Sequence, residues 1–301
     1  MPKITVNKIA TLQGHNDCIY TLSPGLNSSQ VISGAGDGMV VVWDINNPKD
    51  GELVVQVPNS VYALHLIPNS VNLIVGQNFE GIHEIDLQTR KETRSLKLTT
   101  SEIFDIQSYD NRLIVATKTG EVLVVNKESF LVEKNIQAST VSARTIAIGK
   151  TDFAIGYSDN CIRIFDKKTL ELTHSLLAHE ISVFTLQYSP NGKYLISGSR
   201  DAHIKFWNTT TYQLEESVAA HMYAINHITF SDSGNYFFSC SMDKSIKIWD
   251  SETKKLLKVI DKARYAGHGT SINKLYWSSY YQYLIAASDD RTLTIWNIKF
   301  D

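Results

Sequence analysis

The apolar and polar positions of residues 179–218 alternate in short runs that predict four β-strands. Segments rich in β-branched and aromatic residues occupy Ser182–Tyr188, Tyr194–Ser199, Ile204–Asn208 and Gln213–Val218. Turn-forming residues separate these segments, as in Ser-Pro-Asn-Gly and Thr-Thr-Thr. No helical period of apolar residues runs long enough to compete. The pattern therefore predicts one unit of four antiparallel strands.

The same unit returns about every forty residues along the chain. In four copies a Gly-His or Ala-His pair is followed 28 positions later by Trp, and an Asp stands six positions before that Trp. The four copies end at Trp43, Trp207, Trp249 and Trp296, and weaker copies continue through Ile85, Val125 and Phe165. The steps between these seven positions are 42, 40, 40, 42, 42 and 47 residues. A period of this length with these marks is typical of a propeller. We therefore predict an all-β chain, with residues 1–301 forming one domain of seven four-stranded antiparallel blades.

The chain ends predict how the ring closes. After Trp296 the sequence stops at NIKFD, which supplies a third strand for the seventh unit but no fourth. The segment Ile4–Leu12 precedes the first Gly-His pair and has no unit of its own. We expect residues 1–12 to provide the missing outer strand of blade seven, because this pairing removes an exposed sheet edge.

These residues resemble the WD-repeat β-propeller family across the whole chain. The resemblance implies a hydrogen-bonded tetrad in which Asp accepts from His, His bonds Ser, and Ser bonds the Trp indole. Such a network satisfies buried polar groups between blades. Three complete sets are present: His15, Ser33, Asp37 and Trp43; His179, Ser197, Asp201 and Trp207; and His221, Ser239, Asp243 and Trp249. The seventh unit keeps His268, Asp290 and Trp296 but has Ala286 at the serine position.

The second, third and fourth units depart from the family pattern. Val57, Lys97 and Gln137 occupy the positions where the constant spacing expects histidine. Phe79 and Thr119 replace two turn aspartates, whereas the fourth unit keeps Asp159. We therefore expect these three blades to be held by packing alone.

Composition indicates a soluble globular protein and narrows its partners. The 301 residues are 43% hydrophobic and 20% charged, with a net charge of -2, so electrostatics gives no reason to expect nucleic acid or an anionic membrane as partner. Three well-separated cysteines, Cys18, Cys161 and Cys240, form no obvious disulfide framework. The N-terminus lacks the apolar core of a signal peptide, and no apolar stretch is long enough to span a membrane. We expect a cytoplasmic location and a monomeric ring within a larger complex.

The sequence offers no convincing catalytic or metal site. Ser, His and Asp of the tetrads recur at identical repeat positions, which favours a structural device over a hydrolase, and no G-x-S-x-G elbow is present. No P-loop, no G-x-G-x-x-G and no zinc-ligand spacing occurs. We therefore expect no enzyme activity, no cofactor and no metal.

One set of positions is a candidate binding site. In WD-repeat proteins the residue five beyond the tetrad histidine opens the innermost strand at the central mouth of the ring. Counting from the histidines, or aligning the weak units on their strands, gives Tyr20, Tyr62, Phe104, Arg144, Phe184, Asn226 and Asn273. In the family the residue before the turn Asp lies nearby, which adds Lys118 and Arg200 and makes blades three to five locally basic. The insertion DKARYAGH before blade seven is expected to bring Arg264 and Tyr265 to the same face.

Two functions remain open at this point. Tyr and Arg are enriched at binding hot spots, which favours a non-catalytic scaffold that binds a peptide segment of a partner protein at the mouth. The alternative is a small-ligand or enzymatic propeller that works in the central channel, where Thr21, Ala63, Thr185 and Thr229 are expected instead of catalytic residues. The mouth aromatics would be part of the core if they pack between blades.

Overall fold

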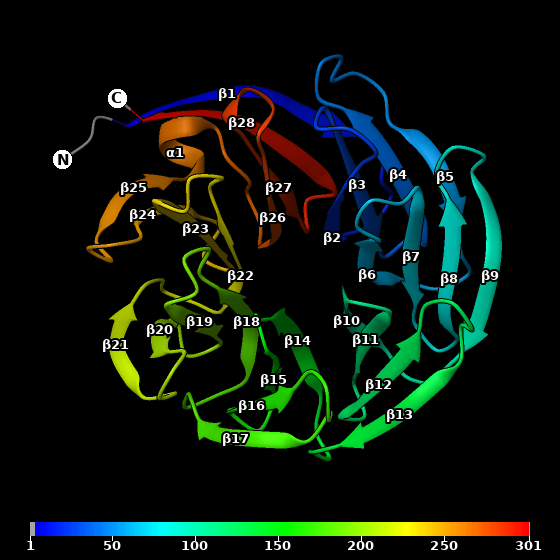
Figure 1. Cartoon of the computed structure of the whole chain (residues 1–301). Coiled ribbons are helices and arrows are strands. Elements are labelled where there is room, and N and C mark those ends of the chain that lie inside the picture. The colour runs from blue at the N-terminus through cyan, green and yellow to red at the C-terminus, as the bar shows by residue number, and fades with distance from the viewer. Residues whose placement is uncertain (1–3, 301) are drawn as a thin grey trace.

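Seven four-stranded antiparallel sheets stand around a ring in the computed structural model, which describes residues 4–300 (Figure 1). The predicted seven-bladed propeller is confirmed. Residues 1–3 and 301, which the predicted domain includes, lie outside the described part of the chain.

Six blades use their strands in chain order from the centre of the ring outward, and blade seven takes its outer strand, β1, from the start of the chain. Blades one to three contain β2 (Ile19–Pro24), β3 (Gln30–Ala35), β4 (Met39–Asp44), β5 (Glu52–Gln56); β6 (Val61–Leu66), β7 (Asn72–Gln77), β8 (Gly81–Asp86), β9 (Lys91–Lys97); and β10 (Ile103–Tyr109), β11 (Arg112–Thr117), β12 (Glu121–Asn126), β13 (Val132–Gln137). Blades four to six contain β14 (Ala143–Ile148), β15 (Asp152–Tyr157), β16 (Cys161–Asp166), β17 (Leu172–Leu177); β18 (Val183–Tyr188), β19 (Tyr194–Ser199), β20 (His203–Asn208), β21 (Leu214–Ala219); and β22 (Ile225–Phe230), β23 (Tyr236–Ser241), β24 (Ile246–Asp250), β25 (Leu256–Ile260). Blade seven contains β26 (Ile272–Ser278), β27 (Tyr283–Ser288), β28 (Thr292–Phe300) and β1 (Ile4–Gln13). A short helix α1 (Lys262–Tyr265) and a 3-10 turn η1 (Tyr280–Gln282) complete the chain.

Burial falls from the middle strands to the outer strands of each blade. All six residues of β19 are buried, because this strand packs against a neighbouring blade on each face, whereas five of the six residues of β21 are exposed. The middle strands are therefore mostly apolar or small along both faces, and the outer strands are not. The apolar core is divided among clusters between adjacent blades, so each blade buries its faces only against its neighbours. A side chain at Gly198 would collide with Ile225 of the next blade, with only 2.8 Å to its Cγ2, so this glycine allows the close approach of two blades.

The ring closes where the two ends of the chain meet, at the top of Figure 1. Strand β1 pairs antiparallel with β28 from Ile4 opposite Phe300 to Gln13 opposite Thr292, with one bulge after Lys8. Leu12, Val6 and Ile4 are buried in clusters that join blade seven to its neighbours. The expected closure of blade seven by the N-terminal strand is therefore seen for the described residues.

Three blades contain the hydrogen-bonded network that the family resemblance implied. In blade five, His179 Nδ1 lies 2.9 Å from Asp201 Oδ2, its Nε2 lies 2.8 Å from Ser197 Oγ, and the Trp207 indole donates to the same oxygen at 2.9 Å. The networks of Trp43 and Trp249 have the same connections, with indole to serine distances of 2.8 and 2.9 Å. The bond to His179 lowers the pKa of Asp201, so this buried carboxylate stays ionised at neutral pH.

Blade seven builds the same network with a different residue. Ala286 cannot supply a hydroxyl, but Thr294 lies directly opposite it on β28. The Thr294 hydroxyl lies 2.8 Å from His268 Nε2 and accepts from the Trp296 indole at 3.0 Å. The hydroxyl has therefore moved to the cross-strand neighbour, and the network is complete.

Thr294→Val should destabilise the protein by about 1–3 kcal/mol, because it leaves the buried His268 and Trp296 nitrogens without their partner. Adding Ala286→Ser to Thr294→Val returns a hydroxyl to the position used in the other blades and should recover most of the loss. Urea unfolding of the single and double variants measures the difference. A double variant no more stable than the single one would show that the hydroxyl is not exchangeable between the two strands.

In blades two to four, the alignment of the repeat and the contacts that hold the blades together both differ from those expected. Ile103 and Val125 are 22 positions apart, whereas Val183 and Trp207 are 24 apart, because the inner hairpins of blades three and four are two residues shorter. Lys97 and Gln137 consequently end outer strands. The place of the histidine in blade four falls to Ser139, whose Oγ donates to Asp159 at 2.8 Å.

The expectation that these three blades rely on packing alone is wrong. Arg94 of blade two pairs with the buried Glu84 at 2.6 Å and donates to two backbone carbonyls of blade three. Arg112 of blade three pairs with Glu133 at 2.7 Å and donates to the Lys167 carbonyl of blade four at 3.0 Å. Ionic side chains near the outer strands thus tie together the blades that lack the histidine network.

Candidate functional site at the mouth of the ring

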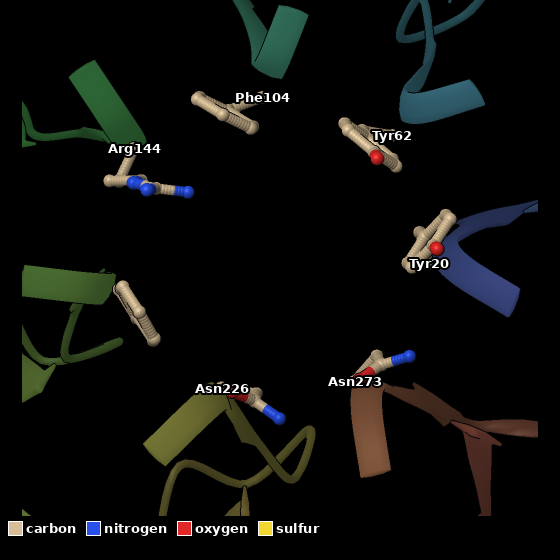
Figure 2. Close-up of a pocket in the computed structure, with 7 residues that line it drawn as sticks. Tyr20, Tyr62, Phe104, Arg144, Asn226 and Asn273 are labelled. Atoms are coloured by element: carbon tan, nitrogen blue, oxygen red, sulfur yellow. The ribbon is translucent and has the colours of Figure 1, made fainter. Parts of the chain in front are cut away.

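The seven predicted binding residues converge on one opening, which we call the mouth. It is lined by Tyr20, Tyr62, Phe104, Arg144, Phe184, Asn226 and Asn273 (Figure 2). The cavity has a volume of about 310 Å³. All seven side chains are half-buried, and none belongs to a core cluster between blades. They therefore form the surface of a cavity. The alternative that these aromatic side chains pack in the core between blades is not what the structure has.

A β-bulge in every blade directs these side chains. In blade one Ile19 pairs with Ala35 and Thr21 with Gly34, which leaves Tyr20 as an extra residue without a partner on β3. The same irregularity falls at the mouth residue of the six other blades. A bulge bends the strand locally and re-aims its extra side chain. The repeated bulge, which no spacing in the sequence revealed, explains why the mouth is built from a single position of the repeat.

Blades one to three contribute an aromatic arc. The rings of Tyr20 and Tyr62 meet edge to face at 4.5 Å between centroids, and Tyr62 stacks on Phe104 at 6.0 Å. Burial raises the pKa of both phenols, so both hydroxyls remain protonated and can donate hydrogen bonds. This arc offers ring faces for an apolar group together with two polar hydrogen-bonding tips.

Arg144 stands between two aromatic rings at the end of this arc. Its guanidinium carbon lies 4.4 Å from the ring centre of Phe104 and 5.4 Å from that of Phe184. Its Nε donates to Ser158 Oγ at 2.9 Å. Within residues 4–300 no carboxylate lies within ion-pair distance of Arg144, and burial lowers its pKa. The guanidinium is thus held in place by Ser158 and the two rings, it is partly desolvated, and no carboxylate among the described residues pairs with it.

Blades six and seven contribute amides that bind the ring together. Asn226 donates to the backbone carbonyl of Ile272 at 2.8 Å, which ties blade six to blade seven. Asn273 donates to the carbonyl of Ile19 at 2.9 Å and to the Asp289 carboxylate at 2.7 Å, which ties blade seven to blade one. These two amides therefore fix the shape of the mouth opposite the aromatic arc.

Fewer side chains than predicted add net positive charge to blades three to five. Lys118 forms an ion pair with Glu102 at 2.6 Å, so it adds little net charge. Arg200 is exposed and has no ion pair among the residues that the structure describes. Positive charge beside the mouth therefore comes from Arg144 and Arg200.

The insertion before blade seven does not reach the mouth. It forms α1, which begins after Asp261 and lies beside β25 and β1 near the outside of the ring in Figure 1. Tyr265 packs against the core between blades six and seven, and Lys8 of β1 donates to the Ala266 carbonyl at 2.7 Å. Arg264 and Tyr265 are therefore not among the residues that line the mouth, and this segment packs beside the ring closure.

Polar groups of the innermost strands take part in contacts between blades. Asp105 accepts from the Ile146 backbone N–H at 2.8 Å, and Thr185 accepts from that of Ile228 at 3.2 Å. His227 accepts from the next blade in the same way at 3.3 Å. These bonds explain why polar residues lie along the channel. In the described part of the chain no three His, Cys, Asp or Glu side chains are grouped as metal ligands.

The ring of blades with recurring Trp, His and Asp defines a WD-repeat propeller. The family model of the WD40 repeat, described as "WD domain, G-beta repeat", matches residues 6–44, 170–208, 212–250 and 260–297, just over half of the chain. The protein belongs to the WD40 repeat family. The unmatched central stretch holds most of blades two to four, where ionic ties replace the histidine network.

Curated relatives include the striatins. The chain is 29% identical to human Striatin-3 over 194 residues, which cover 64% of this chain and 21% of that protein. It is 24% identical to rat Striatin over 229 residues, which cover 67% and 29% of the two chains. The chain thus spans between a fifth and a third of the length of these relatives. Family membership supports a protein-interaction role in general terms.

No helix among the described residues is long and apolar enough to cross a membrane.

Proposed function

We propose that this propeller is a non-catalytic scaffold that binds an extended segment of a partner protein at the mouth. An apolar side chain of that segment packs on Tyr20, Tyr62 and Phe104, and an adjacent acidic group pairs with Arg144. The observation that carries the proposal is the Arg144 guanidinium, held between two aromatic rings inside an open cavity without a carboxylate partner.

The energetics of the mouth support this choice of ligand. Arg144 has lost part of its hydration, and a carboxylate would replace that hydration with short charge-assisted hydrogen bonds. The aromatic rings are already held by their contacts with each other, so little side-chain entropy is lost when an apolar group covers them. Aromatic and Arg side chains at the centre of an interface are the residue types that contribute most to affinity.

Tyr62→Ala should weaken partner binding by about 2 kcal/mol, close to thirtyfold, because it removes the central ring of the aromatic arc. A matched exposed change, Glu215→Ala on β21, should leave the affinity unchanged. The partner is first identified by affinity capture, comparing the parent chain with a Tyr62→Ala, Phe184→Ala double variant. Titration of the purified partner then measures each dissociation constant, and circular dichroism confirms that each variant is folded. Equal affinity of Tyr62→Ala and the parent would place the binding surface elsewhere.

A further inference from the structure

Exposed apolar side chains lie on one part of the rim around the mouth, and we call this set the rim patch. It consists of Val141, Ile181, Met222, Tyr223 and Met242. Met222 is 82% exposed, Tyr223 62% and Met242 50%, which is unusual for large apolar residues that lie close together.

Three of the five rim-patch residues occupy a repeat position that is polar in the other blades. The residue three places before each mouth residue lies on the loop that enters the innermost strand. In blades four to six this residue is Val141, Ile181 or Tyr223. In the other four blades it is Thr270, Asp17, Asn59 or Ser101. At this loop position the apolar character is therefore confined to one arc of the ring and is not a requirement of the repeat.

The backbone beneath the rim patch is fixed. Ser199 Oγ donates to the Ile181 carbonyl at 3.2 Å, and Ser241 Oγ donates to the Tyr223 carbonyl at 3.1 Å. Met242 follows Ser241 directly, and its N–H donates to the Ala224 carbonyl at 3.0 Å. In blade six the patch thus presents the flexible side chains of Met222 and Met242 on loops held by hydrogen bonds, and methionine adapts to partner side chains of different shape.

Charge divides the rim into two sides. Arg144, Arg200 and Lys244 lie on the arc of the rim patch, against one acidic side chain, Glu180, that forms no ion pair among residues 4–300. This excess of positive charge favours an acidic segment over blades four to six.

Two acidic residues lie on the opposite side of the rim, at the junction of blades seven and one. Asp17 accepts from the Cys18 N–H at 2.7 Å, and the Cys18 thiol donates to the Asp289 carbonyl at 3.5 Å, so the two acidic residues flank the junction of blades seven and one. Asp289 also touches the mouth through Asn273. Neither carboxylate has an ion pair with Arg291 or any other cation in the described part of the chain.

From these observations we infer that the bound segment leaves the mouth over blades four to six, where its apolar residues pack on the rim patch. The inference rests on the proposed function. It adds the path along which the partner segment leaves the mouth and the residue types that the segment contains. The partner segment carries an acidic residue that reaches Arg144, followed on one side of the sequence by bulky apolar residues. The flexible methionines accept any bulky apolar residue at these places.

The test uses a random dodecapeptide library displayed on phage and selected on the full chain. Selected peptides should contain Asp or Glu with two or more bulky apolar residues on one side of it. A fluorescent synthetic copy of the most enriched peptide is then titrated by anisotropy. Tyr223→Ser with Met242→Ser should weaken binding at least tenfold, and so should Arg144→Gln. Leu214→Ser, an exposed apolar residue at the start of β21, is the matched control and should bind like the parent. Thermal melts confirm that every variant is folded.

The outcomes separate the inference from the proposed function. A rim double variant that binds as well as the parent, while Arg144→Gln binds weakly, overturns the exit path and leaves the mouth in place. Full binding by both variants, basic selected peptides, or no enrichment relative to the Arg144→Gln chain overturns both ideas. A dimer in light scattering that the rim double variant abolishes would assign the patch to a second copy of the chain and overturn the inference.

Discussion

A chain that lacks residues 1–12 should fail to form a stable monomeric ring. The loss removes the strand that pairs with β28 along its length, and it removes the buried side chains of Ile4, Val6 and Leu12. Full burial of each such side chain is worth about 1.5–3 kcal/mol, so the loss approaches the 5–15 kcal/mol that stabilises a typical protein. It also exposes an edge strand able to pair with other molecules. We therefore expect aggregation and a much lower melting temperature.

Size-exclusion chromatography with light scattering and a thermal melt check this result. A synthetic peptide of residues 1–13, added in trans, should pair with β28 and raise the melting temperature of any soluble truncated chain. Thr11→Ala in the intact chain serves as a control, since Thr11 is exposed on β1 and its loss should change little. A truncated protein that stays monomeric with an unchanged melt would contradict the role of β1 in closure.

Trp207→Ala should cost about 3–5 kcal/mol, the range found when a large buried aromatic side chain is removed. Trp207 packs in the cluster between blades four and five and donates its indole N–H to Ser197. Trp207→Phe keeps most of the packing while it removes the hydrogen bond and some side-chain volume, so its cost should be clearly smaller. Chemical denaturation of both variants gives the two free energies of unfolding. Equal costs would mean that the hydrogen bond, and not the packing, carries the contribution of Trp207.

The repeat explains why most of the fold was predictable from the sequence. Trp207, His179 and Asp201 recur at fixed spacing because each blade must satisfy the same buried groups. The segment Ile4–Leu12 belongs to no repeat unit of its own, and it forms the outer strand of blade seven. The seven mouth positions followed from the same register, and the structure brings them around one cavity.

What the sequence did not reveal depends on contacts across strands and between blades. Thr294 supplies a hydroxyl from the strand opposite Ala286, and linear spacing does not encode that neighbour. The pairing of Arg94 with Glu84 and its bonds to blade three depend on how two sheets pack. The carboxylate that neutralises Lys118 comes from a different loop of its blade. Such contacts become visible only when the separate strands are placed in space.

The bulge at the mouth has a consequence for how this protein can change. Each mouth residue is the one residue of its strand that has no cross-strand partner. Its side chain can therefore be changed without altering the strand pairing that holds the blade together. Replacing Arg144 or Phe184 would change the lining of the cavity and leave the ladder of backbone bonds intact. The chemistry of the cavity and the free energy of unfolding are therefore expected to vary independently at Arg144 and Phe184, but not at Asn226 and Asn273, whose amides tie neighbouring blades together. The same scaffold could acquire a new partner through a few substitutions, without compensating changes elsewhere in the ring.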